Sequence, residues 1–262
     1  MPGWFADLAL ALELADAADT ITLRRFGAVD LAIEAKPDLT PVSDADRAVE
    51  SMLHDRLAEL RPGDGMVGEE YGATGGNAER RWIVDPIDGT RNFVRGAPVW
   101  ATLLALQDGD EIVLGVVSAP ALGRRWWAVR GEGAWTKREG SSIRPCRVSK
   151  VAELDDAFVA YSSLHGWEER GRLDGFLSLT RSVARTRGFG DFWSHMLVAE
   201  GAVDISCEPE VNLWDLAALQ PIVEEAGGRF SDLSGIDRAD GGSVVCSNGL
   251  LHDDVLALLS SR

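Results

Sequence analysis

Cysteines and long apolar runs are scarce in this sequence of 262 residues. The three cysteines, Cys146, Cys207 and Cys246, are odd in number and form no Cys-x-x-Cys pair, which favours reduced thiols and a cytoplasmic protein. The apolar N-terminal stretch is interrupted by acids and has no base before Arg24. This pattern indicates an amphipathic helix rather than a signal peptide or a membrane span, so we expect a soluble protein with no membrane partner.

Positive charge is also scarce, with 26 bases against 42 acids and a net charge of −16. A nucleic-acid backbone is therefore not the expected partner. The four histidines are scattered and form no His-Glu-x-x-His motif, which argues against zinc, and we interpret His195 as an ordinary core or surface residue of a helix. No P-loop, nucleophile-elbow or dinucleotide-binding glycine motif occurs. Cys246 has no histidine near it before His252, so a cysteine nucleophile has weak support.

Apolar periodicity divides the chain into two halves. Residues 1–149 are expected to form two helices, over 4–26 and 44–60, on an antiparallel sheet, with a mobile glycine-rich loop over 71–80. Strands are expected at 28–35, 66–70, 82–85, 98–107, 111–119, 125–130, 133–137 and 143–148. In residues 150–262 strands alternate with helices, which indicates an α/β layer. The strands are expected at 157–161, 183–187, 203–207 and near 229 and 244, and the helices at 168–179, 191–200, 213–226 and 250–260. No long linker separates the halves, so we expect them to be fused into one catalytic unit.

The stretch from Trp82 to Phe93 carries the strongest chemical signal. A short apolar run ends at Asp85, and Asp88 follows three residues later. Two acids so close together at the end of a buried strand are costly unless a cation neutralises them. Gly89 and Thr90 then indicate a turn into a helix start, where unpaired backbone N–H groups bind phosphate. The stretch therefore predicts a place where metal ions meet a phosphate.

Other acids stand at the start of an element or the end of a strand, namely Asp44, Asp46, Glu69, Glu70 and Asp215. Taken alone, Ser43-x-x-Asp46 and Asn212-x-x-Asp215 are more typical of helix-capping boxes than of ligands, and Glu69-Glu70 is more typical of a solvated turn. Carboxylates with a backbone carbonyl are the ligands of Mg²⁺ or a similar hard ion. Metal-assisted attack of water on a phosphate ester is the chemistry that remains.

Two longer segments, Asp85-Pro86-Ile87-Asp88-Gly89-Thr90 and Trp214-Asp215-Leu216-Ala217-Ala218, resemble the two signatures of the inositol monophosphatase superfamily. Gly68-Glu69-Glu70, Lys36 with Ser43-x-x-Asp46, and Gly131-Glu132-Gly133-Ala134 are similar to further segments of that family, and the resemblance covers nearly the whole chain. It implies an α+β or α/β fold, built as a layered αβαβα sandwich. It also implies a Mg²⁺-dependent, lithium-sensitive phosphomonoesterase that forms a homodimer.

The resemblance implies a role for each matching residue. Glu69, Asp85 and the Ile87 carbonyl would hold a first metal ion. Asp85, Asp88 and Asp215 would hold a second, and Glu69 would help to place a loosely held third, so that two or three Mg²⁺ ions, or Mn²⁺ as a substitute, would bind. Asp46 and Thr90 would orient and deprotonate the attacking water, with Glu69 beside them, and the N–H groups of Gly89 and Thr90 would hold phosphate. Ser43 stands where the family usually has threonine, and because both carry a hydroxyl we expect a modest effect.

Two details are similar to the branch of the family that hydrolyses histidinol phosphate. Arg91 follows Gly89-Thr90, and Gly190-Asp191 is followed within two residues by an aromatic side chain. A carboxylate complements the ammonium and imidazole groups of histidinol phosphate better than it complements a neutral polyol. The candidate contacts to that cation are Asp191, then Glu208, then Glu210. Alternatively, Asp191 caps the helix over 191–200, Glu208-Pro209-Glu210 is a solvated turn, and Trp193 packs rather than stacking on substrate.

Three functions are left open by the sequence. The first is hydrolysis of L-histidinol phosphate in histidine biosynthesis, and the second is hydrolysis of inositol 1-phosphate or of a broader set of sugar and nucleotide phosphates. The third, from another class, is a metal-binding regulatory or RNA-processing protein with the same fold. That third function predicts a missing acid or a basic face, whereas every acid is present and the net charge is −16. We therefore expect a small-molecule phosphate ester as the partner.

Overall fold

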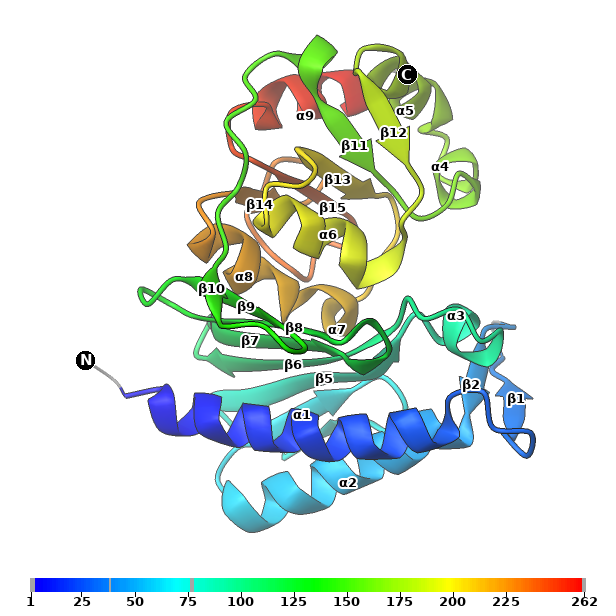
Figure 1. Ribbon diagram of the computed structural model, residues 1–262, viewed down its shortest axis with the longest axis vertical. Helices are drawn as coiled ribbons and strands as arrows, with labels where there is room; N and C mark the ends of the chain where they lie inside the picture. The colour runs from blue at the N-terminus through cyan, green and yellow to red at the C-terminus, as the bar shows by residue number, and fades with distance from the viewer. Residues whose placement is uncertain (1–2, 38, 76–77, 261–262) are drawn as a thin grey trace.

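The computed structural model describes residues 3–37, 39–75 and 78–260. Five layers follow one another from helix to sheet to helix to sheet to helix, as Figure 1 shows, and this confirms the expected αβαβα sandwich. None of the described helices combines the length and the hydropathy that a membrane crossing requires. The proposed division at residue 149 falls between the last strand of the first sheet and the first strand of the second.

The first two layers are a helix pair and a large sheet. Helices α1 (Phe5–Arg25) and α2 (Asp44–Leu60) pack on one face of the sheet, whose strand order is β10-β9-β8-β7-β6-β5-β3-β4. The strands are β3 (Gly65–Gly68), β4 (Gly72–Thr74), β5 (Arg80–Asp88), β6 (Ala101–Asp108), β7 (Glu111–Ala119), β8 (Arg124–Val129), β9 (Ala134–Arg138) and β10 (Arg144–Pro145). A small hairpin of β1 (Ile33–Ala35) and β2 (Pro41–Ser43) precedes α2.

One strand pair of the large sheet departs from the predicted antiparallel pattern. Strands β3 and β5 run parallel, with Gly68 opposite Val84. The reason is that β4 folds back on the outer edge of β3, so that the chain re-enters on the other side of β3 in the original direction. The C-terminal ends of β3 and β5 therefore meet at one edge of the sheet, which brings Glu69 beside Asp85.

The other three layers come from the second half of the chain. A sheet of order β12-β11-β13-β15-β14 has β11, β12 and β13 parallel, while β15 runs antiparallel to both of its neighbours. Its strands are β11 (Phe158–Ala160), β12 (Arg185–Arg187), β13 (Ile205–Glu208), β14 (Arg229–Ser231) and β15 (Val244–Ser247). Helices α6 (Asp191–Ala199), α7 (Leu213–Leu216) and α8 (Leu219–Glu225) lie between the two sheets, and α4 (His165–Glu169), α5 (Leu173–Arg181) and α9 (His252–Ser260) cover the outer face (Figure 1). Short connecting helices are α3 (Thr90–Val94), η1 (Pro120–Leu122) and η2 (Leu154–Asp156).

Two predicted helices are each broken in two. The helix expected over 168–179 is divided into α4 and α5 near Gly171, whose φ of 64° lies outside the helical region. The helix expected over 213–226 is divided into α7 and α8, and Pro221 near the start of α8 has no N–H to donate to the preceding turn. The first break turns the chain at the outer layer, and the second lets α7 approach the end of β5.

Two predicted strands and one predicted loop also differ from the structure. The strand expected over 28–35 is confined to Ile33–Ala35, and the one over 143–148 to Arg144–Pro145. The loop expected over 71–80 contains β4 at Gly72–Thr74, so that part of it is ordered by pairing with β3. Residues 76–77 of the same loop lie outside the described residues.

Candidate active site

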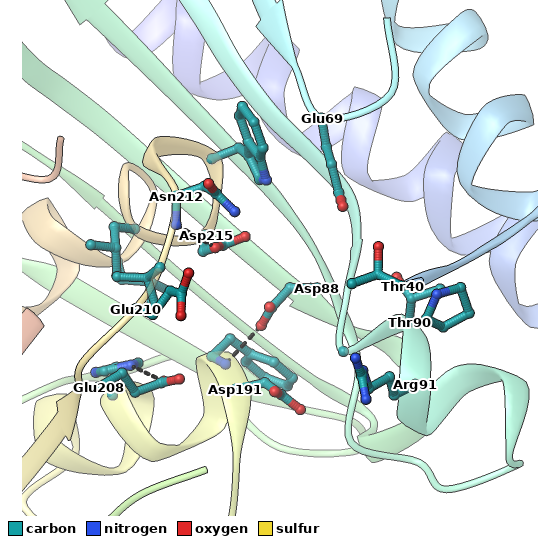
Figure 2. A pocket seen from close by; sticks show the side chains of 18 of the residues that line it. Thr40, Glu69, Asp88, Thr90, Arg91, Asp191, Glu208, Glu210, Asn212 and Asp215 are labelled. Atoms are coloured by element: carbon teal, nitrogen blue, oxygen red, sulfur yellow. Dashed lines mark hydrogen bonds and ion pairs between the residues drawn. The ribbon is translucent and has the colours of Figure 1, made fainter. Parts of the chain in front are cut away.

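A pocket of about 550 Å³ opens where the C-terminal edge of the large sheet meets α6 and α7. Figure 2 shows its acidic side chains arranged around a common space, with Glu69 on one side and Asp88, Asp191 and Asp215 facing it. Of the residues predicted for the site, those that line the pocket are Glu69, Asp88, Gly89, Thr90, Arg91, Asp191, Glu208, Glu210 and Asp215. The remaining three, Asp46, Asp85 and Ile87, are buried directly behind its wall.

Strand β5 and helix α7 bring three carboxylates together. Oxygens of Asp85, Asp88 and Asp215 all lie within 4.8 Å of one another. The strand register against β6 shifts between Asp85 and Asp88, and this bulge brings two acids three residues apart to the same cluster. Asp85 Oδ1 accepts a hydrogen bond from the Ile87 N–H at 3.0 Å, and Asp88 Oδ2 accepts one from the Phe192 N–H at 2.7 Å.

The cluster has strongly perturbed acidities. Burial, reinforced by neighbouring carboxylates, raises the pKa of Asp85 and of Asp88 well above the usual range. Burial likewise raises the pKa of Asp215 to about 7, although a hydrogen bond from the Asn212 N–H opposes the shift. Carboxylates this close ionise together only when a cation compensates them, and an oxygen-only set of this kind suits a hard divalent metal ion. The residues present therefore fit a metal site.

Helix α2 starts beneath this cluster with a capping box that also serves the site. Asp46 Oδ2 accepts from the N–H and the hydroxyl of Ser43, at 2.8 and 2.6 Å, while Ser43 Oγ accepts from the Ala45 N–H at 3.2 Å. The other oxygen of Asp46, Oδ1, lies 3.2 Å from the Thr90 hydroxyl, which is 2.9 Å from the Ile87 carbonyl. The predicted cap is thus confirmed, and it fixes Asp46 toward Thr90. Burial raises the pKa of Asp46, and the nearby Glu69 carboxylate adds to the effect.

Lys36 and Glu50, neither of which was predicted as a site residue, support Glu69 and the turn that carries it. Lys36 Nζ lies 2.7 Å from Glu69 Oε1 and 2.6 Å from Glu70 Oε1. The fully buried Glu50 accepts from the N–H groups of Glu70 and Tyr71, at 2.8 Å each, and so fixes the turn after β3. Glu50 stands four residues after Asp46 on the same face of α2, and an acid within an apolar helix stripe is a signal that could have identified it.

Gly89 has a backbone conformation that the site requires. Its φ is 85°, and a Cβ at this position would lie 2.8 Å from the Val99 carbonyl oxygen and 3.2 Å from Asp191 Oδ2. The segment can therefore approach α6 closely only because residue 89 is glycine. Thr90 then begins the short helix α3, as the turn into a helix start predicted.

Asp191 faces the pocket rather than capping its helix. It is the first residue of α6, its φ is 49°, and the cap position is occupied by Gly190. Its Oδ2 accepts from Asn92 Nδ2 at 2.7 Å, and its N–H donates to Ser162 Oγ at 2.8 Å. The capping alternative is thus wrong for the Asp191 side chain. Burial, together with the Glu208 and Asp215 carboxylates, raises its pKa to about 7, against the opposing charge of Arg91.

Glu208 and Glu210 lie across the pocket from Thr90 and Arg91, as Figure 2 shows. Glu208 Oε1 is 2.9 Å from Nε2 of His195, whereas Glu210 is paired with Arg170 at 2.5 Å and is half exposed. The prediction that His195 is an ordinary core or surface residue was incomplete, because this buried side chain also lines the pocket. Its Nδ1 lies 3.2 Å from Cys246 Sγ, so Cys246 does have a histidine partner, 51 residues away in sequence. Trp193 packs against Phe189, as expected.

Fold and site together define a phosphatase-like class of protein, and the comparisons with known proteins agree. The model of the inositol monophosphatase family matches residues 6–262, so the chain belongs to that family. A Streptomyces coelicolor protein named histidinol-phosphatase is 56% identical over the full length of both chains. A second histidinol-phosphatase, from Mycobacterium tuberculosis, is 57% identical over 97% of this chain and 98% of the relative.

Solved structures show the same architecture. The extragenic suppressor protein suhB from Bartonella henselae has a TM-score of 0.89 at 30% identity, over 98% of this chain and 99% of that one. An inositol monophosphatase from Zymomonas mobilis has a TM-score of 0.86 at 30% identity over 100% of both chains. Family membership and homologues at this level of identity indicate that the chain is a phosphoric monoester hydrolase.

Proposed function

We propose that this chain is a Mg²⁺-dependent phosphomonoesterase that hydrolyses L-histidinol phosphate to L-histidinol and inorganic phosphate. The observation that carries the proposal is the position of Asp191 and Glu208, two partly buried carboxylates in the same pocket as the Asp85–Asp88–Asp215 cluster. A second anionic group beside the phosphate site suits a phosphate ester that carries its own positive charge. The names of the two bacterial relatives described above support the same substrate.

The proposed metal ligands are those that the family resemblance implies. Glu69, Asp85 and the Ile87 carbonyl would hold one Mg²⁺, Asp85, Asp88 and Asp215 a second, and Glu69 would help to hold a third, with Mn²⁺ as a substitute. Ions bound there would lower the pKa of a bound water, neutralise the charge of the phosphate and stabilise the leaving alkoxide. Lys36, which pairs with Glu69 and Glu70, supplies positive charge to the same acids.

Asp46 and Thr90 form the proposed proton path. The Asp46 carboxylate is anchored by Ser43 on one oxygen and faces the Thr90 hydroxyl with the other. The Thr90 hydroxyl would orient a bound water molecule. As the oxygen of that water attacks phosphorus, a proton of the water would pass to Asp46. The raised pKa of Asp46 suits it to accept that proton. Glu69 lies close enough to Asp46 to influence its charge.

The substrate would be held at both ends. The N–H groups of Gly89 and Thr90 and the guanidinium of Arg91, three residues that line the pocket, would bind the phosphate. Asp191 and Glu208 would bind the ammonium and the imidazole. Glu210 is the third candidate, although Arg170 already neutralises it.

Phosphate release from L-histidinol phosphate and from inositol 1-phosphate, each with Mg²⁺ and after chelation, tests the proposal. We expect rapid release from L-histidinol phosphate only with Mg²⁺, and much slower release from the inositol ester. Equal rates on the two esters would favour the broad inositol or sugar phosphatase. Release from neither ester would favour a metal-binding regulatory protein with the same fold.

The proposal extends to the setting of the enzyme. We infer a cytoplasmic, lithium-sensitive homodimer that takes part in histidine biosynthesis, in keeping with the family resemblance. The three cysteines are free and buried, which suits a reducing compartment. Light scattering of the purified protein tests the dimer, and phosphate release in the presence of LiCl tests the lithium sensitivity.

A further inference from the structure

A buried histidine lies behind Glu208, outside the groups to which the proposed chemistry gives a role. His195, on α6, is 1% exposed, with Nε2 2.9 Å from Glu208 Oε1 and Nδ1 3.2 Å from Cys246 Sγ. We propose that His195 is a positioning residue for substrate specificity, which holds the Glu208 carboxylate toward the cationic end of the substrate while Cys246 sets its tautomer. This inference rests on the proposed function, because it concerns one of the two carboxylates that would bind the cation.

The sheet topology brings these three residues together. Strands β13 and β15 pair antiparallel with Ser206 opposite Cys246. Glu208 comes two residues after Ser206, so Cys246 and Glu208 lie on the same face of the sheet. Helix α6 packs on both strands at that face, and His195 reaches between them from the helix.

The available protons determine the direction of both hydrogen bonds. An ionised carboxylate only accepts, so His195 must donate its Nε2–H to Glu208. In a neutral imidazole Nδ1 is then an acceptor, and the Cys246 thiol is the group that donates to it. Burial raises the pKa of Cys246 well above its usual value, so the thiol keeps its proton at neutral pH. The series of hydrogen bonds thus runs from the Cys246 S–H to His195 Nδ1, and from His195 Nε2–H to Glu208.

This arrangement leaves Glu208 fixed but still able to bind a ligand. Within the part of the chain that the structure describes, His195 is the hydrogen-bond partner of only one Glu208 oxygen, and the second oxygen has none. The Glu208 side chain is 15% exposed, at the pocket wall. Without the Nε2–H, the Glu208 carboxylate loses its one hydrogen-bond donor. A cationic substrate would then have to order the Glu208 side chain when it binds. The loss should therefore appear in the KM of a cationic substrate rather than in its kcat.

Steady-state kinetics of the full chain with saturating Mg²⁺ test the inference. We compare His195→Leu with His195→Gln, whose side-chain amide offers an N–H close to the position of Nε2. His195→Leu should raise the KM for L-histidinol phosphate by about tenfold, the effect of one lost hydrogen bond to a charged group, with kcat little changed. The KM for p-nitrophenyl phosphate should change much less, and His195→Gln should restore most of the affinity for L-histidinol phosphate.

Several results would overturn the inference. They are equal losses on both esters, no loss on either, or a glutamine variant as impaired as the leucine variant. A wild-type enzyme that does not prefer L-histidinol phosphate would instead contradict the proposed function, so the two failures are distinguishable.

A second pair of variants covers the case in which His195→Leu does not fold. Cys246→Ser keeps a donor to Nδ1, and Cys246→Val removes it with a similar volume. Only Cys246→Val should raise the KM for L-histidinol phosphate, by a smaller factor than His195→Leu. Equal behaviour of the serine and valine variants would contradict the role of Cys246.

Discussion

At the scale of single residues, Asp191 combines a strained backbone with a perturbed side chain. Its φ of 49° is in a region that non-glycine residues seldom adopt, and its carboxyl has a pKa of about 7, raised by burial and by neighbouring carboxylates. Such features persist where the surrounding structure fixes them, and they concentrate at functional sites. Asn92 and Ser162 fix Asp191, one through the side chain and one through the backbone.

Asp191→Asn tests whether this residue binds the cationic end of the substrate. The amide keeps the size and the polar contacts but removes the negative charge. We expect the KM for L-histidinol phosphate to rise by about 10- to 100-fold, as for a lost charge-assisted hydrogen bond, and the KM for p-nitrophenyl phosphate to rise far less. The exposed Asp155→Asn removes the same charge away from the pocket and serves as the control. Similar losses on both esters would mean that Asp191 is structural.

The sequence predicted the acids of the site better than their supports. Asp85, Asp88 and Asp215 are recognisable because each follows or opens an element in a characteristic segment, and the structure brings them within 4.8 Å. Asn92 and His195 were not predicted as site residues. Their hydrogen-bond partners, Asp191 and Glu208, are 99 and 13 residues away in the sequence, and only folding brings each pair into contact. Local sequence patterns identify the acids that stand at the ends of helices and strands. The residues that support those acids depend on tertiary packing, which a local pattern does not show.

At the scale of elements, the turn after β3 decides where Glu69 points. Gly68 is in contact with the carboxylate of Glu50 on α2, and a Cβ at residue 68 would lie only 2.0 Å from Glu50 Oε1. Glu50 cannot move freely, because it is fully buried and accepts two backbone N–H groups of the same turn. The end of β3 and the face of α2 therefore position Glu69 jointly.

Gly68→Ala should disturb this junction while leaving the rest of the pocket intact. Displacing Glu50 breaks hydrogen bonds to a charged, buried acceptor, so we expect a loss of about 1–3 kcal/mol in the free energy of unfolding and weaker binding of Mg²⁺. Chemical denaturation and calorimetric titration with Mg²⁺ measure the two effects. The control is Gly63→Ala, where a Cβ meets no atom within 4 Å. Unchanged Mg²⁺ affinity in Gly68→Ala would contradict the positioning role of the turn.

Elements with strong local signals were predicted well. Helix α2 begins at the predicted capping box and ends at Leu60, the residue that the apolar periodicity predicted. The breaks between α4 and α5 and between α7 and α8 were missed, since one glycine or proline inside an apolar periodicity does not by itself end a helix. The parallel pairing of β3 with β5 was also missed, because it depends on the placement of the edge strand β4.

At the scale of the whole molecule, the pocket concentrates negative charge between the two halves of the chain. Asp85 and Asp88 come from the first sheet, and Asp191, Glu208 and Asp215 from the second half. In the absence of a cation, burying the four aspartates of this set together is costly to folding, and their raised pKa values express that cost. Metal binding should therefore stabilise the fold as well as enable chemistry.

The metal-free protein should become less stable as the pH rises from about 4 to about 7. In this window the unfolded carboxyls ionise while Asp191 and Asp215, with folded pKa values of about 7, keep their protons, so the folded state binds more protons. His252 acts in the opposite direction, since burial lowers its pKa to about 4, but it is one group against several acids.

Melting temperatures in EDTA at pH 5 and pH 8 measure this effect. We expect the lower value at pH 8, and a larger stabilisation by Mg²⁺ at pH 8 than at pH 5, because the metal binds ionised carboxylates. Asp215→Asn should flatten the dependence on pH. A metal-free protein that is more stable at pH 8, or a Mg²⁺ effect that is the same at both values, would contradict the linkage.

The central claim is that two carboxylates in a phosphatase pocket recognise the positive charge of the substrate. The most direct test compares kcat/KM for L-histidinol phosphate with kcat/KM for its N-acetyl derivative, which keeps the phosphate, the carbon chain and the imidazole but has no ammonium group. We predict a loss of about 10- to 100-fold for the acetylated ester with the wild-type enzyme, and a much smaller loss with Asp191→Asn. Equal kcat/KM values for the two esters in the wild-type enzyme would contradict the claim.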